Sequence, residues 1–346
     1  MQRRRARCGS WRSFLGPTAV SDTVLELRDL YVQYASGSKR VKAVDGISLK
    51  LRRGSILALV GESGCGKTTA ALAVLGLLPH PGKVEHGEIH FDGRDLLSMD
   101  GGELRRIRGR EISMIFQDPV AGLNPVLSVG EQVQEIISAH TSASKREARR
   151  MVHEALQRVG LARPEELTSR YPFQLSGGMS QRVIIAIATV LNPTVIIADE
   201  PTSALDVTVQ AGILSELQRL RDEHGASILL ITHDLGIVAQ MADDVAVMYA
   251  GRIAEDGPAR EVLRRPRHPY TWALLSALPR LDQERRPLEA IKGSPPDLAE
   301  LPDECAFVPR CRKAITTCRQ SPAPPLTEQA PAQRAACYNP VYHPDE

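Results

Sequence analysis

The chain has 346 residues, of which 42% are hydrophobic and 24% are charged, a composition typical of a globular protein rather than a disordered or fibrous one. Its 43 basic and 41 acidic residues give a formal net charge of +2, so no overall field attracts it to nucleic acid or to membrane lipid. The apolar run at residues 183–191 is about half of the roughly 18 residues that a membrane-spanning helix requires. We therefore expect a protein that binds no nucleic acid and does not cross a membrane by itself.

The first part of the chain is basic and then becomes strand-like. Gly16 and Pro17 interrupt the segment after the initial arginines, so residues 1–21 are expected to be a mobile tail and not a secretory signal. Apolar and polar residues alternate over 24–32 and again over 47–51, the pattern of half-buried strands. An antiparallel layer is therefore expected to begin the folded region.

A phosphate-binding motif follows the next apolar run. Residues 56–60 are continuously apolar and predict a strand buried on both faces of a mostly parallel sheet, and 70–78 predict an apolar helix. Residues 61–68 between them match the pattern G-x-x-x-x-G-K-[ST]. Backbone N–H groups at a helix start bind phosphate oxygens, and Lys67 adds a full positive charge. Thr68 offers its hydroxyl to Mg2+.

The predicted nucleotide contacts of this loop include its glycines, its hydroxyl side chains and its lysine. They are Gly61, Ser63, Gly64, Cys65, Gly66, Lys67, Thr68 and Thr69. Cys65 is interpreted as a small residue beside the phosphates rather than as a nucleophile.

The middle of the chain changes to a helical pattern between about residues 123 and 171. Apolar side chains such as Val152, Ala155 and Leu156 fall on one helix face, opposite charged residues. This predicts a helical subdomain over about 120–185, inserted into an α/β core. Strand-like runs return at 195–198 and 227–231.

Two acids end the first of these returning strands. α/β proteins bind ligands at the carboxyl edge of the sheet, so Asp199 is predicted to hold Mg2+ and Glu200 to polarise an attacking water. Acids after a strand are by themselves more often a helix cap. The catalytic interpretation depends on their pairing with the phosphate loop.

Prolines become frequent after about residue 257, and the apolar periodicity fades, which predicts an irregular C-terminal region. It contains Cys305, Cys311, Cys318 and Cys337, whereas Cys8 belongs to the tail. Zinc sites favour cysteine pairs separated by two to four residues, which this spacing lacks, and disulfides are disfavoured in a reducing cytosol. Four thiolates can hold an iron–sulfur cluster. Iron–sulfur, zinc and unligated thiols all remain open.

Residues 175–181, Leu-Ser-Gly-Gly-Met-Ser-Gln, resemble the signature of ABC ATPases, and the chain over about 24–279 resembles that superfamily. The resemblance implies an α/β P-loop NTPase core over 22–260, with an antiparallel β subdomain and the helical insertion, and a C-terminal extension over 261–346. In the family, the helix start at Ser176, Gly177 and Gly178 contacts the γ-phosphate bound by the opposite subunit.

The resemblance also assigns roles to three other positions, and an aromatic side chain before the phosphate loop adds a fourth site residue. Gln117 corresponds to the glutamine that reaches Mg2+ and the attacking water, and Asp206 to the acid that contacts the facing phosphate loop. His233 corresponds to the histidine that contacts the γ-phosphate. Tyr34 is the predicted adenine-stacking ring, with Tyr31 as the alternative.

Within the superfamily, the chain is similar to the ATPases of oligopeptide, dipeptide and nickel importers, on the motifs at 115–119, 123–125, 129–132, 198–210 and 268–271. Ser180 departs from the arginine that is usual in that group. The resemblance implies ATP hydrolysis coupled to import, most directly of peptides. It also implies a location at the cytoplasmic face of the cell membrane.

The partners implied are a second ATPase subunit, two permeases and, indirectly, an extracytoplasmic solute-binding protein. The implied cofactors are ATP, Mg2+ and a [4Fe-4S] cluster at the four C-terminal cysteines. A nickel or other small-solute importer and a soluble non-transport ABC ATPase remain alternative functions.

Overall fold

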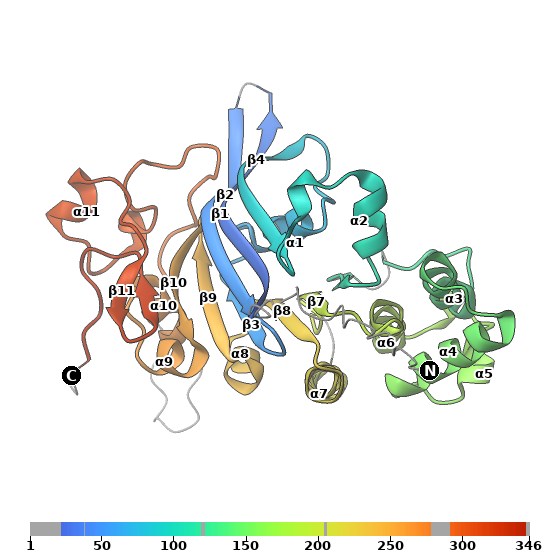
Figure 1. Cartoon of the computed structure of the whole chain (residues 1–346). Helices are drawn as coiled ribbons and strands as arrows, with labels where there is room; N and C mark the ends of the chain where they lie inside the picture. Colours follow the sequence, from blue (N-terminus) through green and yellow to red (C-terminus); the bar gives the residue numbers. More distant parts are fainter. Residues whose placement is uncertain (1–21, 38, 119–121, 204–205, 278–290, 344–346) are drawn as a thin grey trace, which may run out of the picture.

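The structure, a computed structural model, describes residues 22–37, 39–118, 122–203, 206–277 and 291–343. The basic segment 1–21, with Cys8, lies outside the described residues, as do Pro119, Ala204 and Leu205 of the motif ranges given above. The described elements form two sheets surrounded by helices (Figure 1). None of the described helices is both long and apolar enough to cross a membrane.

The smaller sheet has the strand order β2-β1-β4-β5, and its neighbouring strands are antiparallel. The strands are β1 (Thr23–Ser36), β2 (Lys39–Arg52), β4 (Gly82–Phe91) and β5 (Arg94–Asp95). Leu25, Leu27 and Ile47 are buried on one face, because successive side chains of a strand point to opposite sides of a sheet. The expected antiparallel layer is confirmed, although β1 and β2 extend beyond the alternating patterns.

The larger sheet has the order β11-β12-β10-β9-β3-β8-β7-β6. Its strands are β3 (Ile56–Val60), β6 (Ile112–Ile115), β7 (Val195–Asp199), β8 (Ser227–Thr232), β9 (Asp244–Tyr249), β10 (Arg252–Pro258), β11 (Thr327–Ala330) and β12 (Gln333–Ala335). The strands from β9 to β6 run parallel, and every residue of β3, β7 and β8 is buried. Burial on both faces explains their continuous apolar sequences and confirms the predicted α/β core.

The helix after β3 differs from its expected range of 70–78. α1 runs from Lys67 to Val74, and Leu75 is its C-cap. Gly76 follows with φ +59°, a left-handed conformation that ends helices. The helix therefore begins inside the phosphate motif itself.

A group of helices lies at one end of the molecule, on the right of Figure 1. They are α3 (Val129–His140), α4 (Lys145–Arg158), α5 (Pro164–Leu167) and α6 (Gly177–Thr189). Ser128 begins α3 and Ser144 begins α4, each in a capping box with the glutamate three residues later. Apolar side chains of these helices share one core cluster with Ile196 and Ile228 of the sheet. This end is therefore joined to the sheet by apolar packing.

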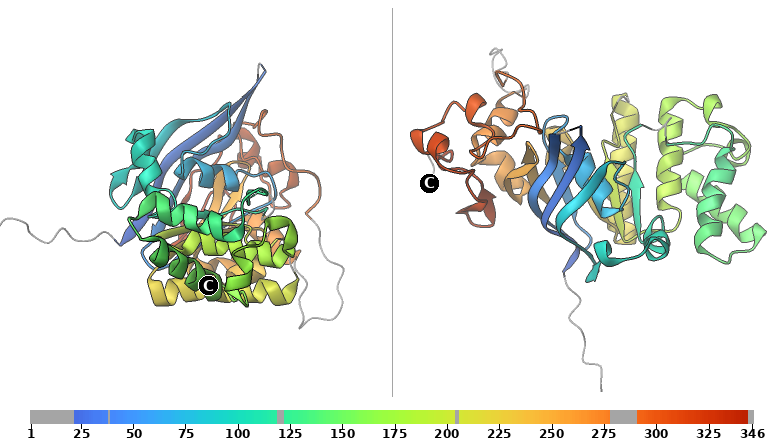
Figure 2. Two further views of the ribbon diagram at one scale, coloured as in Figure 1. Left: turned by 90° about the vertical axis from the view of Figure 1, so that its right-hand side faces the viewer. Right: turned by 90° about the horizontal axis from the view of Figure 1, so that it is seen from above.

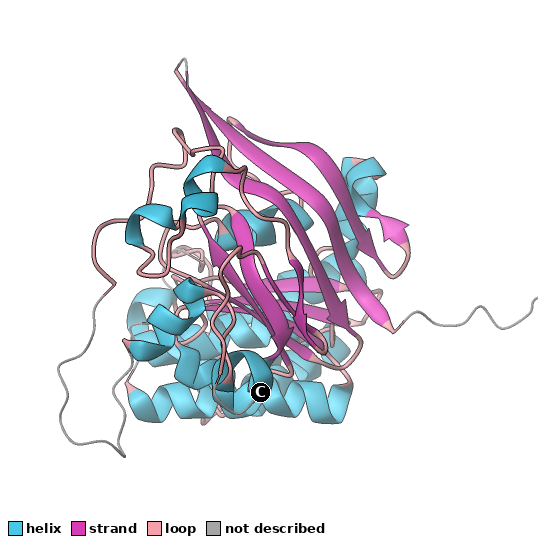
Figure 3. Ribbon diagram, turned by 90° about the vertical axis from the view of Figure 1, so that its left-hand side faces the viewer, coloured by secondary structure: helices cyan, strands magenta, loops and turns pink. Residues whose placement is uncertain are grey.

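The C-terminal part of the chain lies at the opposite end of the molecule (Figure 2). It contains α9 (Ala259–Arg264), α10 (Pro269–Ser276), the 3-10 helix η3 (Val308–Arg310) and α11 (Thr316–Gln320). Long stretches of it are loop (Figure 3). The prediction of an irregular region was wrong for its last part, because β11 pairs with β12 and β12 joins β10 of the larger sheet.

Candidate functional site

Four loops meet at one edge of the larger sheet. They follow β3, β8, β7 and β6, which are parallel neighbours in that order. The register pairs Val60 with Thr232 and Ile115 with Ala198, so adjacent strands end at matching levels. The loops carry the phosphate motif, His233, Glu200 and Gln117, respectively. The carboxyl edge of the sheet therefore gathers residues that are far apart in the sequence.

The phosphate loop needs glycine at two positions for different reasons. A side chain at Gly61 would come within 2.2 Å of the Met248 carbonyl oxygen, whereas Gly64 has open space but a φ of +79°. The loop lines a pocket that also reaches the neighbouring loops. Its lining residues are Ala43, Ser63, Gly64, Gly66, Lys67, Thr68, Thr69, Gln117 and Glu200.

Lys67 occupies the start of α1 and is only 5% exposed. Its ammonium donates hydrogen bonds to the backbone carbonyls of Gly61 and Glu62, at 2.8 and 2.9 Å. The first N–H groups of a helix have no partner within the helix, and they favour anions. The loop therefore presents a cation and a helix start to one pocket, an arrangement suited to phosphate.

Asp199 ends β7 and is 2% exposed. Burial raises the pKa of its carboxyl group, while the hydrogen bond with Thr68 lowers it. Within the described part of the chain, its Oδ1 has no hydrogen-bond partner. A buried carboxylate oxygen without a donor, next to a hydroxyl group, suits a hard cation that takes oxygen ligands. Asp199 and Thr68 therefore fit a Mg2+ ion.

Glu200 is held by side chains from two other loops. Nε2 of Gln117 donates to its Oε2 at 3.1 Å, and Nδ1 of His233 lies 3.0 Å from its Oε1. The φ of Glu200 is +45°, a conformation that is uncommon for residues other than glycine and is enriched at active sites. Its backbone N–H donates to the Ile231 carbonyl at 2.8 Å, which fixes this geometry. The structure thus brings three predicted residues together beside the phosphate pocket.

The signature segment lies apart from this pocket. Ser176 is the N-cap of α6 and accepts a hydrogen bond from the Met179 N–H, while Ser176 and Gly177 are exposed. Asp206 is also exposed and caps α7 (Val207–His224) by accepting from the Val209 N–H at 3.0 Å. None of the described residues 175–181 or Asp206 lines the phosphate pocket. This chain does not bring Ser176, Gly177, Gly178 or Asp206 to its own phosphate loop.

Tyr34 lies on β1 between its partners Val41 and Gly82. A side chain at Gly82 would come within 2.3 Å of the Tyr34 ring, so this glycine makes room for it. The Tyr31 ring instead meets His86 edge to face at 6.0 Å. Neither tyrosine is among the described residues that line the phosphate pocket, so adenine stacking by Tyr34 stays a prediction.

Two known families match the chain. Residues 44–203 match the ABC transporter family, and residues 254–318 match the C-terminal region of oligopeptide/dipeptide transporters. The dipeptide transport ATP-binding protein DppD of Bacillus subtilis is 46% identical over 298 residues, which cover 86% of this chain and 89% of that protein. The chain belongs to the ABC transporter family. It is therefore an ABC ATPase, with the α/β cassette that this family implies.

Other comparisons agree with this assignment. The oligopeptide transport ATP-binding protein OppD of Escherichia coli is 45% identical over 321 residues, 93% of this chain and 94% of that protein. A dimeric structure of the ATP-binding cassette MJ0796 in a post-hydrolysis state, bound to ADP and Pi, superposes with a TM-score of 0.62. It is 29% identical and covers 68% of this chain and 99% of the cassette.

The four C-terminal cysteines of this ABC ATPase line one small pocket, together with His268, Phe307 and Lys313. Burial raises the pKa of the Cys305 and Cys311 thiols and raises that of Cys337 to about 12. Within the described residues, no group of three or more histidine, cysteine or acidic side chains is placed to hold a metal ion. The structure therefore gathers the cysteines without forming a preset site for a single ion.

Sequence reasoning missed one polar contact of this ABC ATPase. Glu62, inside the phosphate motif, forms an ion pair with Arg310 of the C-terminal region, and its backbone N–H donates to the Tyr270 hydroxyl at 3.0 Å. Tyr270 belongs to the motif at 268–271, which indicated the family but did not predict a contact with the phosphate loop. Arg310 belongs to no motif and ends the short 3-10 helix η3, so no sequence pattern could have indicated its partner.

Proposed function

We propose that this chain hydrolyses ATP as the energy-coupling subunit of an importer for peptides. The observation that carries the ATPase part is Glu200, held between Gln117 and His233 at the edge of a phosphate pocket. The peptide part is supported by the match of residues 254–318 and by relatives named as dipeptide and oligopeptide transport ATP-binding proteins.

The proposed chemistry uses the residues of this pocket. The loop glycines and Lys67 bind the β- and γ-phosphates, while Thr68 and Asp199 would hold Mg2+, which would neutralise developing negative charge. Glu200 polarises the attacking water as general base. His233 orients Glu200 and contacts the γ-phosphate, and Gln117 links the water to the helical end of the molecule.

The proposed site is completed by a second ATPase subunit, either a copy or a paralogue. Ser176, Gly177 and Asp206 are exposed and lie away from the phosphate pocket, so they are available to another chain. The related cassette MJ0796 with ADP and Pi is dimeric. Two subunits facing each other would each bind the ATP of the other at the start of α6.

The remaining partners follow from the transport proteins that the chain resembles. We propose that two permease subunits bind the chain at the cytoplasmic face of the cell membrane, with a solute-binding protein on the opposite side. Phe116 and Phe173, near Gln117 and the signature, respectively, are exposed aromatic side chains that a permease could cover.

We propose that the four C-terminal cysteines hold a [4Fe-4S] cluster. The support is that all four line one pocket, and that each iron of such a cluster takes one cysteine, so the sulfurs surround the cluster instead of meeting at one ion. Protein purified without oxygen should be brown and contain iron. A colourless protein that contains zinc but no iron would contradict the proposal.

Uptake by cells tests the proposed function. Deleting the gene should abolish accumulation of a labelled peptide, and wild-type protein should restore it, whereas Lys67→Ala should not. Nickel accumulation measured in the same cells separates the cargoes. Unchanged peptide uptake together with lost nickel uptake would assign the chain to a nickel importer. Unchanged uptake of both would exclude a role in either process.

A further inference from the structure

The phosphate loop is connected to the C-terminal region by a part-buried ion pair. Arg310 donates two hydrogen bonds to Glu62, from Nη1 to Oε2 at 2.7 Å and from Nη2 to Oε1 at 2.9 Å. The Arg310 side chain is 6% exposed, and that of Glu62 is 23% exposed. A two-pronged arginine–carboxylate contact fixes orientation as well as distance. These residues are 248 positions apart in the sequence.

Aromatic side chains hold both partners in place. Arg310 also donates to the Tyr249 hydroxyl at 3.3 Å, and its guanidinium lies 5.8 Å from the centre of that ring. The Tyr270 hydroxyl accepts the backbone N–H of Glu62, and Phe307 packs against Tyr249 and Tyr270. The backbone and the carboxylate of Glu62 are thus both held by residues from β9 onward.

The Glu62–Arg310 contact lies outside the phosphate pocket. Glu62 is not among the described residues that line the phosphate pocket, although the next residue, Ser63, is. Its carbonyl accepts a hydrogen bond from Lys67. A carboxylate in a loop that binds triphosphate would repel the ligand unless a cation neutralised it. Arg310 supplies that cation, and it does so without placing its own charge in the phosphate pocket.

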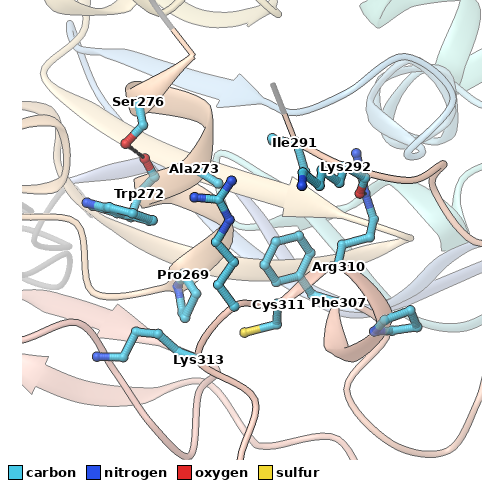
Figure 4. Close-up of a pocket in the computed structure, with 12 residues that line it drawn as sticks. Pro269, Trp272, Ala273, Ser276, Ile291, Lys292, Phe307, Arg310, Cys311 and Lys313 are labelled. Carbon is cyan, nitrogen blue, oxygen red and sulfur yellow. Dashed lines mark hydrogen bonds between the residues drawn. The ribbon is translucent and has the colours of Figure 1, made fainter. Parts of the chain in front are cut away.

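Arg310 is the sequence neighbour of Cys311, which lines the four-cysteine pocket. The two residues line a second pocket with Trp272, Phe307 and Lys313 (Figure 4). Cys311 lines both this pocket and that of the four cysteines. Cys311 therefore connects the four-cysteine pocket to the residue that holds Glu62.

We propose that Arg310 is a positioning residue for the phosphate loop, and that through it the four-cysteine region sets the affinity for ATP. Arg310 neutralises Glu62 and fixes its backbone, so that Lys67 and the loop N–H groups are placed for the phosphates. The inference rests on the proposed function in one respect, that the loop binds ATP.

Variants of the pair test this inference in the full-length protein. Binding of a fluorescent ATP analogue and the kcat and KM for ATP hydrolysis are measured for wild type, Arg310→Met, Arg310→Lys, Glu62→Gln and the double variant Arg310→Met/Glu62→Gln. Arg310→Met should weaken analogue binding about tenfold, the effect of losing one charge-assisted contact, and should raise KM with little change in kcat. Arg310→Lys should recover part of the affinity.

The double variant separates positioning from general stability. Because it removes the unpaired carboxylate, it should bind the analogue more tightly than Arg310→Met, whereas a purely structural arginine would gain nothing from Glu62→Gln. Arg319→Met, an exposed arginine of α11, is the matched control and should bind like wild type. Melting temperatures show which variants are folded.

Two results would overturn the inference. One is a folded Arg310→Met protein with the affinity of wild type, and the other is a double variant as weak as Arg310→Met. If wild-type protein does not bind the analogue at all, the proposed function fails instead, so the two failures are distinguishable.

Discussion

The two ends of the molecule are connected to the phosphate site in different ways. The helical end is joined to the sheet through a shared apolar core, and Gln117, which follows β6 on that side of the sheet, contacts Glu200 through an exposed hydrogen bond. The C-terminal end reaches the phosphate loop through the bidentate, part-buried pair of Arg310 and Glu62. A single exposed hydrogen bond can be made and broken at little energetic cost, whereas a two-pronged arginine–carboxylate pair fixes both distance and orientation. The helical end is therefore suited to transmit motion and the C-terminal end to hold the loop in place.

The largest expected effect is at Glu200, the proposed general base that Gln117 contacts. Glu200→Gln should lower ATP hydrolysis at least about 100-fold, because it removes the proposed general base while keeping the side-chain shape. ATP should still bind, and an ATP-bound dimer should accumulate. Phosphate release and size-exclusion chromatography check this, and unchanged turnover would remove Glu200 from the mechanism.

Gln117→Ala tests the exposed connection. It should lower kcat about tenfold, the scale of a lost hydrogen bond to a charged group, and leave KM for ATP nearly unchanged. The Arg310 variants are expected to show the reverse, a change in KM with kcat preserved. If Gln117→Ala changed KM as strongly as Arg310→Met does, the distinction between the two ends would be lost.

Cys311→Ser tests whether the C-terminal region acts at a distance. It should raise KM for ATP about threefold, less than Arg310→Met, because the effect must pass through one neighbouring residue. The control is Thr316→Ser, at an exposed position of the same region. A Cys311→Ser protein that contains no iron yet keeps the KM of wild type would show that the cysteines do not influence the loop.

The smallest expected effect concerns pH. His268 is buried, and burial lowers its pKa from 6.5 to about 4, so the unfolded chain binds more protons between these values and stability falls as the pH drops through that range. The loss at pH 5.5 should be about 1.4 kcal/mol, or roughly 2–4 °C in Tm. His268→Asn keeps an acceptor for the Tyr270 N–H and should remove this loss.

Thermal unfolding at pH 7.5 and 5.5 checks the pH prediction. The Glu255 carboxylate accepts a hydrogen bond from the backbone N–H of His268. Burial raises the pKa of Glu255, so its contribution to stability increases as the pH falls, opposite to that of His268. The dependence that remains in His268→Asn includes the opposite contributions of Glu255 and Asp199. An unaltered pH dependence in His268→Asn would show that His268 is not the group responsible.

The sequence predicts best where one short segment contains all the information. β3 and the phosphate loop are contiguous, and each glycine, Lys67 and Thr68 has its place in one motif. Glu200 could be predicted as a site residue, but its contacts with Gln117 and His233 depend on the order of parallel strands, which a single sequence does not give. The link between Glu62 and Arg310 could not be predicted, because neither residue type nor spacing marks a partner 248 positions away.

In the C-terminal region, too, contacts between distant residues could not be predicted from the sequence. The four cysteines could be identified as a set, but only the fold places them around one pocket. β11 and β12 were missed because they are short and largely polar, with Thr327 and Glu328 exposed. Such strands form because β10 offers backbone partners, not because of their own apolar pattern.

The pairing of β12 with β10 also has a consequence for solubility. Without it, Glu255 and Asp256 of β10 would lie at an open sheet edge, where unpaired backbone groups can recruit strands of other molecules. The hairpin covers this edge and replaces it with β11, a four-residue strand with polar exposed side chains. A chain that ended at residue 318 would keep three of the four C-terminal cysteines yet expose β10, and it should aggregate more readily than the full-length protein.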